Sequence, residues 1–170
     1  MKEEFIVIKH SELDKSILDE IIRLKQQHWC YPYESQKEWI KNTLEADAIH
    51  LLLRIDKTFI AYLSIRNIGI FVDDKQITGK GVGNVCVDKR FQKYGFGKKL
   101  IEKANEIILA RKDMGILLCR PHLISFYERC GWNEVKYDNL EINKKAFSDV
   151  LMLFNYNLKH ISCISLDRNF

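Results

Sequence analysis

The sequence contains few of the residues that interrupt a folded chain. Its 170 residues include two prolines and eight glycines, and no stretch is rich in Pro, Gly or Ser. Neither a repeat nor a low-complexity tract is present, which argues against a solenoid or a flexible linker. The length suits one domain with its own core and is too short for two of ordinary size. We therefore expect a single domain over residues 1–156 and a tail, residues 157–170, without a clear pattern.

Long hydrophobic runs and targeting signals are also lacking. The apolar stretches are brief, such as 49–53, which has a histidine inside it, and they are far shorter than the roughly 20 residues that cross a bilayer. The N-terminus carries acidic residues and then alternates like a strand, without the apolar core and the cleavage site of a signal peptide. We expect no membrane partner and a cytoplasmic location.

Paired cysteines are absent as well. The five cysteines, at positions 30, 86, 119, 130 and 163, are odd in number, form no C-x-x-C pair and have no regular spacing. This argues against a disulfide framework and against a zinc site. We expect no metal, and we interpret most of these cysteines as reduced core residues.

Charge of neither sign dominates the chain. The 27 basic and 23 acidic residues leave a net charge of +4, a mild excess that favours the approach of an anionic cofactor. No long basic run exists, and aromatic residues are not interleaved with Lys or Arg. We therefore expect no nucleic acid as a partner.

Hydrophobic periodicity predicts a mixed α/β sheet rather than a regular doubly wound one. Ser11 is the cap predicted for the first helix, and Ser35 opens a Ser-x-x-Glu capping box for the second. The helices predicted are 13–28, 35–44, 95–111 and 121–130. The strands predicted are 5–9, 49–55, 59–66, 69–72, a segment that ends at Val87, 115–119, 132–137 and 150–156.

The most informative segment, residues 85–98, leads from a buried strand through a basic turn into the clearest helix. The first N–H groups of a helix have no internal partner and lie at the positive end of its dipole, so they bind phosphate oxygens. Gly95 and Gly97 permit close approach of the backbone. The alternative is a tight turn that merely needs glycine. Neither a P-loop motif nor a complete Rossmann G-x-G-x-x-G is present.

Two motifs in this region resemble those of the GNAT superfamily of acyl-CoA-dependent N-acyltransferases. The family signature is Arg or Gln, two residues, Gly, one residue, then Gly or Ala, and QKYGFG from Gln92 to Gly97 satisfies it. The second family element is a strand followed by a helix with a Phe-Tyr or Leu-Tyr pair before Gly-Phe or Gly-Trp. It is matched by LLC, which ends at Cys119, and by FYERCGW from Phe126 to Trp132.

The resemblance covers about residues 49–156 and implies the fold of this superfamily. That fold is a single α/β domain with a mixed, mostly antiparallel sheet, a central splayed parallel pair, and about four flanking helices. The splay lets an extended cofactor arm replace a missing strand partner. Irregular backbone near Gly81, Gly83 or Asn84 would fit such a splay.

The resemblance also implies where acetyl-CoA binds. The backbone of Cys86 and Val87 would pair with the pantetheine arm like an added strand, and the amides of residues 92–98 would surround the pyrophosphate. The cofactor-binding residues implied are Cys86, Val87, Gln92, Lys93, Tyr94, Gly95, Phe96, Gly97 and Lys98.

The mechanism implied is direct transfer, in which an amine attacks the thioester and an acid protonates the departing thiolate. The resemblance places Tyr127 beside the thioester sulfur as that acid. The alternative is that Tyr127 is a packing aromatic whose hydroxyl finds a backbone partner. No covalent intermediate is required, and a nucleophilic Cys86 or Cys119 would need an activating His or cationic surroundings. We interpret both cysteines as core residues.

The general base is not identified. Family members often place a His or Glu on the strand before the signature, where this chain has Gly81, Gly83 and Asn84. The candidates elsewhere are Glu34, His28 and His122, each of which is also readily explained as a surface or packing residue. A water relay from backbone carbonyls is an equal alternative.

The loop 28–34, HWCYPYE, lies where such enzymes commonly cover the acceptor. Trp29, Tyr31 and Glu34 are the candidate substrate-binding residues, since aromatic rings stack on an amine-bearing ring or sugar. The alternative is that Trp29 and Tyr31 pack the two helices together. The segment 117–132 also looks like parts of aminoglycoside 2'-N-acetyltransferases and of serotonin N-acetyltransferase, whose amines differ, so it selects no substrate.

The function predicted is N-acetyl transfer from acetyl-CoA to a primary amine of a small molecule. A homodimer is compatible with the sequence. One alternative is a CoA-binding module of this fold that serves sensing or assembly without catalysis, which the missing base favours. Another is an interaction protein that shares only the fold, against which the two glycines and Gln92 argue.

Overall fold

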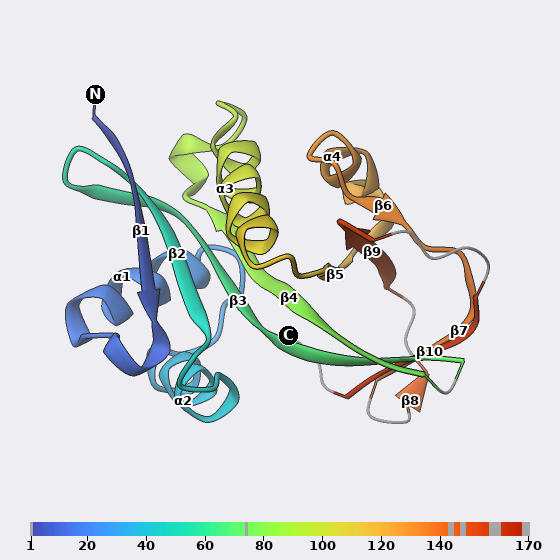
Figure 1. Cartoon of the computed structure of the whole chain (residues 1–170). Helices are drawn as coiled ribbons and strands as arrows, with labels where there is room; N and C mark the ends of the chain where they lie inside the picture. Colours follow the sequence, from blue (N-terminus) through green and yellow to red (C-terminus); the bar gives the residue numbers. More distant parts are fainter. Residues whose placement is uncertain (1, 74, 143–144, 147–148, 157–160, 168–170) are drawn as a thin grey trace. The chain divides into compact units, whose positions relative to one another are not determined.

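The chain forms a mixed sheet and α-helices that are joined by short turns (Figure 1). This computed structural model describes residues 2–73, 75–142, 145–146, 149–156 and 161–167. The α-helices are α1 (Lys15–Gln26), α2 (Tyr33–Thr43), α3 (Phe96–Ala110) and α4 (Ile124–Glu128). The strands are β1 (Glu3–Lys9), β2 (Ile49–Ile55), β3 (Thr58–Val72), β4 (Lys75–Val87), β5 (Gly115–Cys119), β6 (Asn133–Glu134), β7 (Tyr137–Ile142), β8 (Lys145–Ala146), β9 (Val150–Phe154) and β10 (Ile161–Leu166). Among the described residues, no helix is both long and apolar enough to cross a bilayer.

The strands pair in the order β6-β9-β5-β4-β3-β10-β7-β8, and β2 pairs with both β1 and β3. Most neighbouring strands are antiparallel, whereas β4 with β5 and β7 with β10 are parallel. The register of β4 with β5 joins Lys80 to Gly115 and Gly81 to Ile116. The predicted mixed, mostly antiparallel sheet with a central parallel pair and about four helices is therefore confirmed.

Two compact units make up the chain. Unit 1 contains Met1–Arg66 and Asn84–Ile101, and unit 2 contains Asn67–Gly83 and Glu102–Phe170. Strands β3 and β4 and helix α3 each contribute residues to both units.

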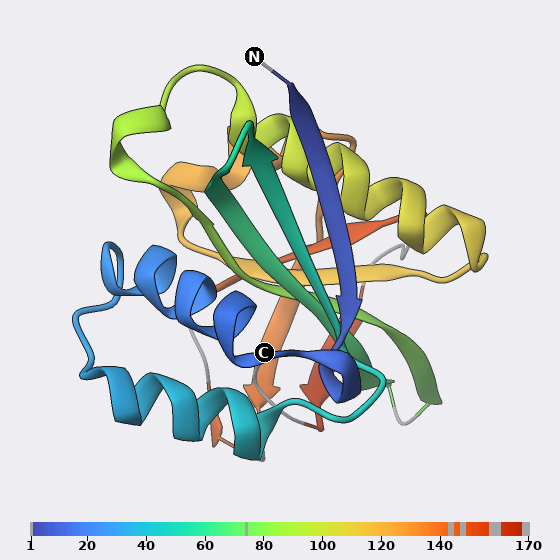
Figure 2. The same ribbon diagram turned by 90° about the vertical axis from the view of Figure 1, so that its left-hand side faces the viewer.

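Unit 1 is built on the antiparallel strands β1 and β2 and the first part of β3. Helices α1 and α2 lie beside this sheet (Figure 2) and are packed against it through a shared core. Ile21 from α1, Ile40 from α2 and Leu52 from β2 are buried in that core. The apolar stripe of α1 therefore faces the sheet, as its spacing predicts.

Both helix starts in unit 1 differ from the sequence prediction. Helix α1 is capped by Asp14, whose Oδ1 accepts a hydrogen bond from the Ile17 N–H at 2.9 Å. Ser11 lies in a short 3-10 turn before it. Helix α2 begins directly after Pro32 without a side-chain cap, because proline lacks the N–H that a helix start leaves unpaired. The caps predicted at Ser11 and Ser35 are therefore wrong.

The long strand β3 corrects another prediction. The predicted hairpin of β2 with the strand that follows it is confirmed, with Leu51 opposite Leu63. The separate strand predicted over 69–72 does not exist as such, because β3 continues to Val72 without a break. Ile68 is fully buried, and its burial keeps the backbone extended through the polar residues where the pattern suggests an end.

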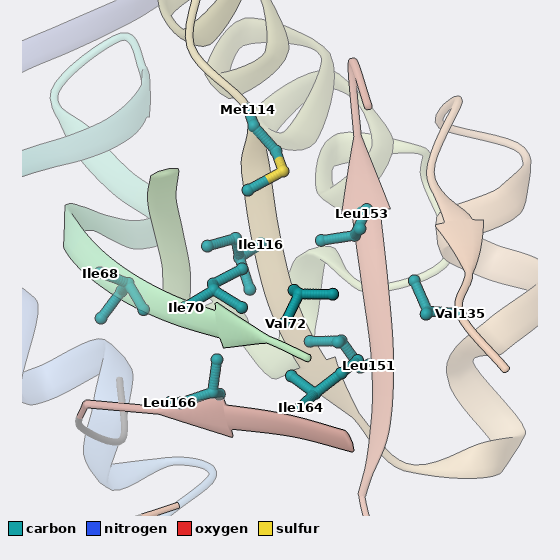
Figure 3. Close-up of a cluster of buried hydrophobic side chains, with 10 residues drawn as sticks. All are labelled: Ile68, Ile70, Val72, Met114, Ile116, Val135, Leu151, Leu153, Ile164 and Leu166. Atoms are coloured by element: carbon teal, nitrogen blue, oxygen red, sulfur yellow. The ribbon is translucent and has the colours of Figure 1, made fainter. Parts of the chain in front are cut away.

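Unit 2 is built on β5, which pairs along its whole length with β9. Strand β6 pairs with the other edge of β9, so the antiparallel pair predicted for 132–137 and 150–156 is confirmed, although β6 is shorter than predicted. A cluster of buried apolar side chains lies in the core of unit 2 (Figure 3). They are Ile68, Ile70, Val72, Met114, Ile116, Val135, Leu151, Leu153, Ile164 and Leu166.

The C-terminal segment, in which the sequence shows no clear pattern, contributes strand β10 to unit 2. This strand pairs antiparallel with β3, with Ile164 opposite Val72, and parallel with β7. Ile164 and Leu166 are buried. Two alternating apolar positions are too short a signal to identify a strand from sequence. Residues 157–160 and 168–170 of the predicted tail lie outside the described residues.

Candidate active site

Asp88 directly follows β4 and anchors the turn that leads to α3. Its N–H donates a hydrogen bond to Ile60 O at 2.7 Å. Its buried carboxylate accepts hydrogen bonds from Arg90, Arg23 and Gln27. These bonds, foremost those from Arg90, hold the pKa of Asp88 far below its ordinary value. Sequence reasoning missed Asp88, although an Asp directly after a buried strand is a signal of a side chain that caps a turn.

The turn that follows places a glycine in the left-handed region. Gly95 has φ 85° and Lys93 has φ 68°, and the Lys99 N–H donates to Gly95 O at 3.1 Å as α3 begins. A Cβ added at Gly95 would meet no protein atom within 4 Å. The backbone conformation, rather than crowding by the protein, is therefore what requires glycine here.

The signature residues form one exposed face at the start of α3. The side chains of Gln92, Lys93, Tyr94 and Lys98 are exposed, so two lysines add positive charge to the segment at the start of α3. The remaining residues of this turn are exposed or half-buried, and they are Gly95, Phe96 and Gly97.

Asn84 interrupts the regular backbone of β4. Its φ is 56°, a left-handed value that is uncommon for a residue with a side chain but is tolerated by asparagine. The irregular backbone predicted near Gly81, Gly83 or Asn84 is therefore confirmed at Asn84. Its Nδ2 donates to the Ser64 Oγ at 2.9 Å, which fixes the direction of the amide.

The end of β4 is in contact with the end of α1. His28 Nε2 lies 2.8 Å from Val87 O, and because a carbonyl only accepts, this nitrogen must carry the proton. If neutral His28 acts as a base, the nitrogen that accepts the proton is therefore Nδ1. Gln92 Nε2 donates to the same Val87 carbonyl at 3.4 Å.

Neither candidate cysteine is activated. Burial raises the pKa of the Cys86 thiol to about 12 and that of the Cys119 thiol to about 11. Both thiols therefore stay protonated near neutral pH, whereas a nucleophilic cysteine must form the thiolate. The interpretation of Cys86 and Cys119 as buried core residues is confirmed.

Lys25 is a buried cation that sequence reasoning missed. Its side chain on α1 is 3% exposed, and its Nζ donates to Asn84 Oδ1 at 2.8 Å. Nζ also lies 4.2 Å from the centroid of the Trp39 ring and 6.0 Å from that of Trp29. Burial is the main reason why the pKa of Lys25 is lowered to about 8. Its burial could have been inferred from the sequence, because Lys25 lies four residues after Ile21 and therefore on the apolar face of the helix.

A chain of buried and half-buried polar groups extends from Asn84 to His10 within unit 1. Ser64 is hydrogen-bonded to Tyr62, the Tyr62 Oη lies 2.9 Å from His50 Nδ1, and His50 Nε2 lies 3.0 Å from His10 Nδ1. Burial lowers the pKa of His50 to about 4, so its imidazole is neutral near pH 7. One arrangement of protons then satisfies every group in the chain: each hydroxyl or N–H donates a hydrogen bond to the next group in the direction of His10.

The candidate acceptor loop is exposed. Tyr31 is 63% exposed and Trp29 is 37% exposed, which is more than a core aromatic that holds two helices together would be. The loop backbone is fixed by Gln26, whose Nε2 donates to Tyr31 O, and by Gln36, whose Nε2 donates to Trp29 O. Its rings are thus presented to solvent on a defined backbone.

The other candidate bases have less organised surroundings. Glu34 lies in the first turn of α2, is exposed, and forms an ion pair with Lys37 at 3.4 Å. His122 is exposed in a short 3-10 turn of unit 2.

Tyr127 lies in α4 of unit 2 and is 6% exposed. Its ring contacts Phe126 edge-on with 5.0 Å between centroids. Burial, and then Cys119 and Cys130, raise the pKa of its phenol above the ordinary value, so the hydroxyl keeps its proton. No hydrogen bond joins this hydroxyl to another described residue.

The segment after α4 is fixed in place. Helix α4 ends at Glu128 and is shorter than the predicted helix 121–130, whose first residues form a 3-10 turn. Gly131, with φ 86°, lies in the turn that follows α4. The Trp132 Nε1 donates to Asn105 Oδ1 at 3.0 Å, and the Asn105 Nδ2 donates to Cys130 O at 2.8 Å. These two buried bonds tie the end of α4 to the part of α3 that belongs to unit 2.

Comparison with known proteins gives a consistent result. A model of the acetyltransferase (GNAT) domain matches residues 47–134, just over half of the chain. No curated protein matches the sequence significantly.

Solved structures share the fold at low sequence identity. Escherichia coli ElaA is 22% identical with a TM-score of 0.67, over 90% of this chain and 99% of that one. An acyl-CoA N-acyltransferase from Pseudomonas aeruginosa is 20% identical with a TM-score of 0.66, again over 90% and 99%. The PaiA N-acetyltransferase from Thermoplasma acidophilum, in complex with coenzyme A, is 16% identical with a TM-score of 0.61, over 92% and 100%. At these identities the likeness concerns the fold alone.

Proposed function

This chain belongs to the GNAT acetyltransferase family, and on that premise we propose that it transfers an acetyl group from acetyl-CoA to a primary amine of a small molecule. The observation that supports this most directly is the turn before α3. It combines Gly95 in a left-handed conformation, exposed lysines and the N–H groups of a helix start. Acetyl-CoA is the cosubstrate typical of the family, and such a turn suits its pyrophosphate.

The donor would bind along the signature segment. The N–H groups of Gly95, Phe96 and Gly97 would donate hydrogen bonds to the pyrophosphate oxygens. Lys93 and Lys98 would add attraction for the negative charge. The space beside Gly95, where no protein atom lies within 4 Å of an added Cβ, is compatible with this mode. The backbone of Cys86 and Val87 and the side chains of Gln92 and Tyr94 complete the proposed donor site.

Tyr127 would protonate the thiolate of coenzyme A as it leaves. Its burial keeps the phenol protonated, which is the state that a general acid requires. No acyl-enzyme is proposed, because the buried thiols of Cys86 and Cys119 stay protonated. The amine nitrogen would therefore attack the thioester carbonyl directly.

The acceptor would lie against the loop that follows α1. The exposed rings of Trp29 and Tyr31 suit stacking or cation–π contact with an amine-bearing substrate. Glu34 would attract an ammonium group, since its carboxylate is exposed close by in the sequence.

A panel of amines tests the proposal. The full-length protein is incubated with acetyl-CoA and with aminoglycosides, arylalkylamines, polyamines or amino-acid amides, and released thiol is measured. We expect turnover with at least one class and a rise in melting temperature with coenzyme A alone. A thermal shift without turnover would favour the alternative of a CoA-binding module without catalysis. The lack of His or Glu at residues 81–84 supports that alternative. Neither shift nor turnover would overturn both.

A further inference from the structure

Lys25 is buried without a carboxylate partner. None of the ion pairs among the described residues involves its Nζ. Its neighbours are instead the amide oxygen of Asn84 and the face of Trp39. A buried ammonium that lacks an anion is costly, and a methionine or leucine would fill the same space more cheaply. A purely structural role therefore explains this residue poorly.

Lys25 lies close to residues of both proposed substrate sites of unit 1. Trp29, in the acceptor loop, lies one helical turn after Lys25, and its N–H donates a hydrogen bond to Lys25 O at 2.8 Å. Asn84 accepts a hydrogen bond from the Lys25 amine. It lies on β4 two residues before Cys86, whose backbone is proposed to pair with the pantetheine arm of the donor. Nζ thus contacts β4, along which the acyl donor is proposed to bind, and lies 6.0 Å from the centroid of the Trp29 ring, which is proposed to contact the acceptor.

We propose that the Lys25 amine is the general base that removes the proton from the attacking amine. This role rests on the proposed acetyltransferase function. The acceptor nitrogen forms a bond to the thioester carbonyl carbon, and the Nζ lone pair takes the proton from that nitrogen. The carbon–sulfur bond then breaks with its electron pair on sulfur, which receives a proton from Tyr127. The products are the N-acetyl amine and coenzyme A, and the two side chains return to their starting states by exchange with water.

The buried polar chain orients the group that holds Lys25. Because the Asn84 Nδ2 donates to Ser64, the Oδ1 of the same amide must face the amine. Ser64 is in turn bonded to Tyr62, and Tyr62 to His50. The Asn84 oxygen can therefore accept a hydrogen bond from the Lys25 amine whether that amine is charged or neutral. A general base needs such a partner, because its charge changes during the reaction.

The surroundings also favour the neutral amine. Burial lowers the pKa of Lys25 to about 8, and the thiol of Cys86 on β4, if ionised, would raise it. His50 on β2 is the other titratable group that interacts with it electrostatically, and α2 contributes the Trp39 ring. A lysine on the surface has a much higher pKa. Near neutral pH its amine would therefore be neutral in only a small fraction of the molecules.

The test compares two substitutions of Lys25 in the full-length protein, with an acceptor found in the amine panel. Lys25→Met keeps the apolar stem and removes the amine, and Lys25→Arg keeps the charge but has no titratable amine. We expect kcat to fall roughly 10²-fold or more in both variants, with little change in the KM for acetyl-CoA. Lys41→Met, an exposed lysine on α2, is the matched control and should keep the wild-type rate.

The pH profile separates a base from a structural residue. In the wild type kcat should rise with pH around the pKa of Lys25, and this limb should be absent in Lys25→Met. The profile is measured with two acceptors of different basicity, because a limb that belongs to the acceptor moves with it. A melting temperature of Lys25→Met at or above that of the wild type would show that the loss of rate is not a loss of fold.

Two outcomes overturn the role of Lys25 alone. One is wild-type turnover together with an active Lys25→Arg variant, and the other is a pH limb that persists in Lys25→Met. A wild type that turns over no amine would instead overturn the proposed acetyltransferase function, and the role of Lys25 with it.

Discussion

The two units of this protein have different interiors. The core of unit 2 is apolar, and its strands carry Ile, Leu, Val and Met inward. Among the described residues, the buried polar side chain of unit 2 is Asn105, whereas unit 1 buries an apolar core together with Lys25, Gln36, His50, Ser64, Arg66 and Asp88. Polar burial of this kind costs free energy unless every group is satisfied. The contrast suggests that unit 2 serves mainly to hold the fold, whereas the interior of unit 1 is arranged for chemistry.

The largest expected effect on stability tests the apolar side of this contrast. Leu151→Ala removes a fully buried side chain from the core of unit 2 and should lower the free energy of unfolding by about 2–5 kcal/mol. Leu109→Ala, the same change at a half-exposed position of α3, should cost less than about 0.5 kcal/mol. Denaturant titration measures both, and equal losses would contradict the idea that this core holds the fold.

Tyr127 is the exception to the contrast, because it is a proposed catalytic group in unit 2. Tyr127→Phe should lower the rate roughly 10²-fold when chemistry limits turnover. The free energy of unfolding should change little, because no hydrogen bond joins the hydroxyl to another described residue. Tyr156→Phe removes the same atom from a more exposed ring of unit 2 and should leave the rate unchanged. A wild-type rate in Tyr127→Phe would leave the protonation of the thiolate to water.

Asp88 provides a test of the polar interior of unit 1. Asp88→Asn removes the charge that the side chains of Arg23 and Arg90 contact, and should lower the free energy of unfolding by about 1–3 kcal/mol. It should also weaken coenzyme A binding, because the turn it anchors leads to residues 92–98. Asp113→Asn, at a partly exposed ion pair with Lys80, should cost at most about 1 kcal/mol.

The stabilisation by Asp88 should also depend on pH in a defined direction. Its pKa is lower in the folded protein than in the unfolded chain. The stabilisation is therefore fully present above the unfolded value of about 4 and is lost as the pH falls below it. Measured between neutral and acidic pH, the difference in unfolding free energy between wild type and Asp88→Asn should shrink in that window. A difference that stayed constant would mean that the carboxylate is not the source of the stability.

Local signals and long-range contacts explain which parts of this picture the sequence could predict. Helix α3, the glycine turn before it and the glycine in the turn after α4 depend on residues that are close in sequence, and they were predictable. The bond from Lys25 to Asn84 joins residues 59 positions apart, and that from Arg23 to Asp88 joins residues 65 apart. No periodicity encodes such contacts, because they form only when α1 packs beside β4.

The missed strand and caps have a similar explanation. Strand β10 depends on its partners β3 and β7 rather than on a strong pattern of its own. Ser35 satisfies a capping-box spacing, but Pro32 starts the helix earlier. A local signal is therefore overridden where another local constraint or a distant partner is stronger.

Gly95 gives a smaller effect that separates strain from obstruction. Gly95→Val forces a branched side chain to adopt φ near 85° and should cost about 1–2 kcal/mol, while the thermal shift with coenzyme A disappears. Gly95→Asn adopts the left-handed conformation more easily, so it should fold with nearly wild-type stability and still lose the shift. A full shift in Gly95→Asn would mean that the backbone at Gly95 does not approach the ligand.

Tyr31 should give the smallest effect on stability, and it tests whether the exposed loop of unit 1 serves the acceptor. Its ring is 63% exposed, so Tyr31→Ala should change the free energy of unfolding by less than about 0.5 kcal/mol. If the ring contacts the substrate, the KM for the amine should rise while the affinity for coenzyme A stays the same, because the donor is proposed to bind along β4 and the start of α3. Tyr33→Ala is the contrasting variant, since the Tyr33 hydroxyl donates to Asp19 at 2.5 Å between α2 and α1 and its loss should lower stability. Equal losses of stability and of both affinities in Tyr31→Ala would instead identify Tyr31 as a packing residue, and the acceptor would then have to be bound by other parts of unit 1.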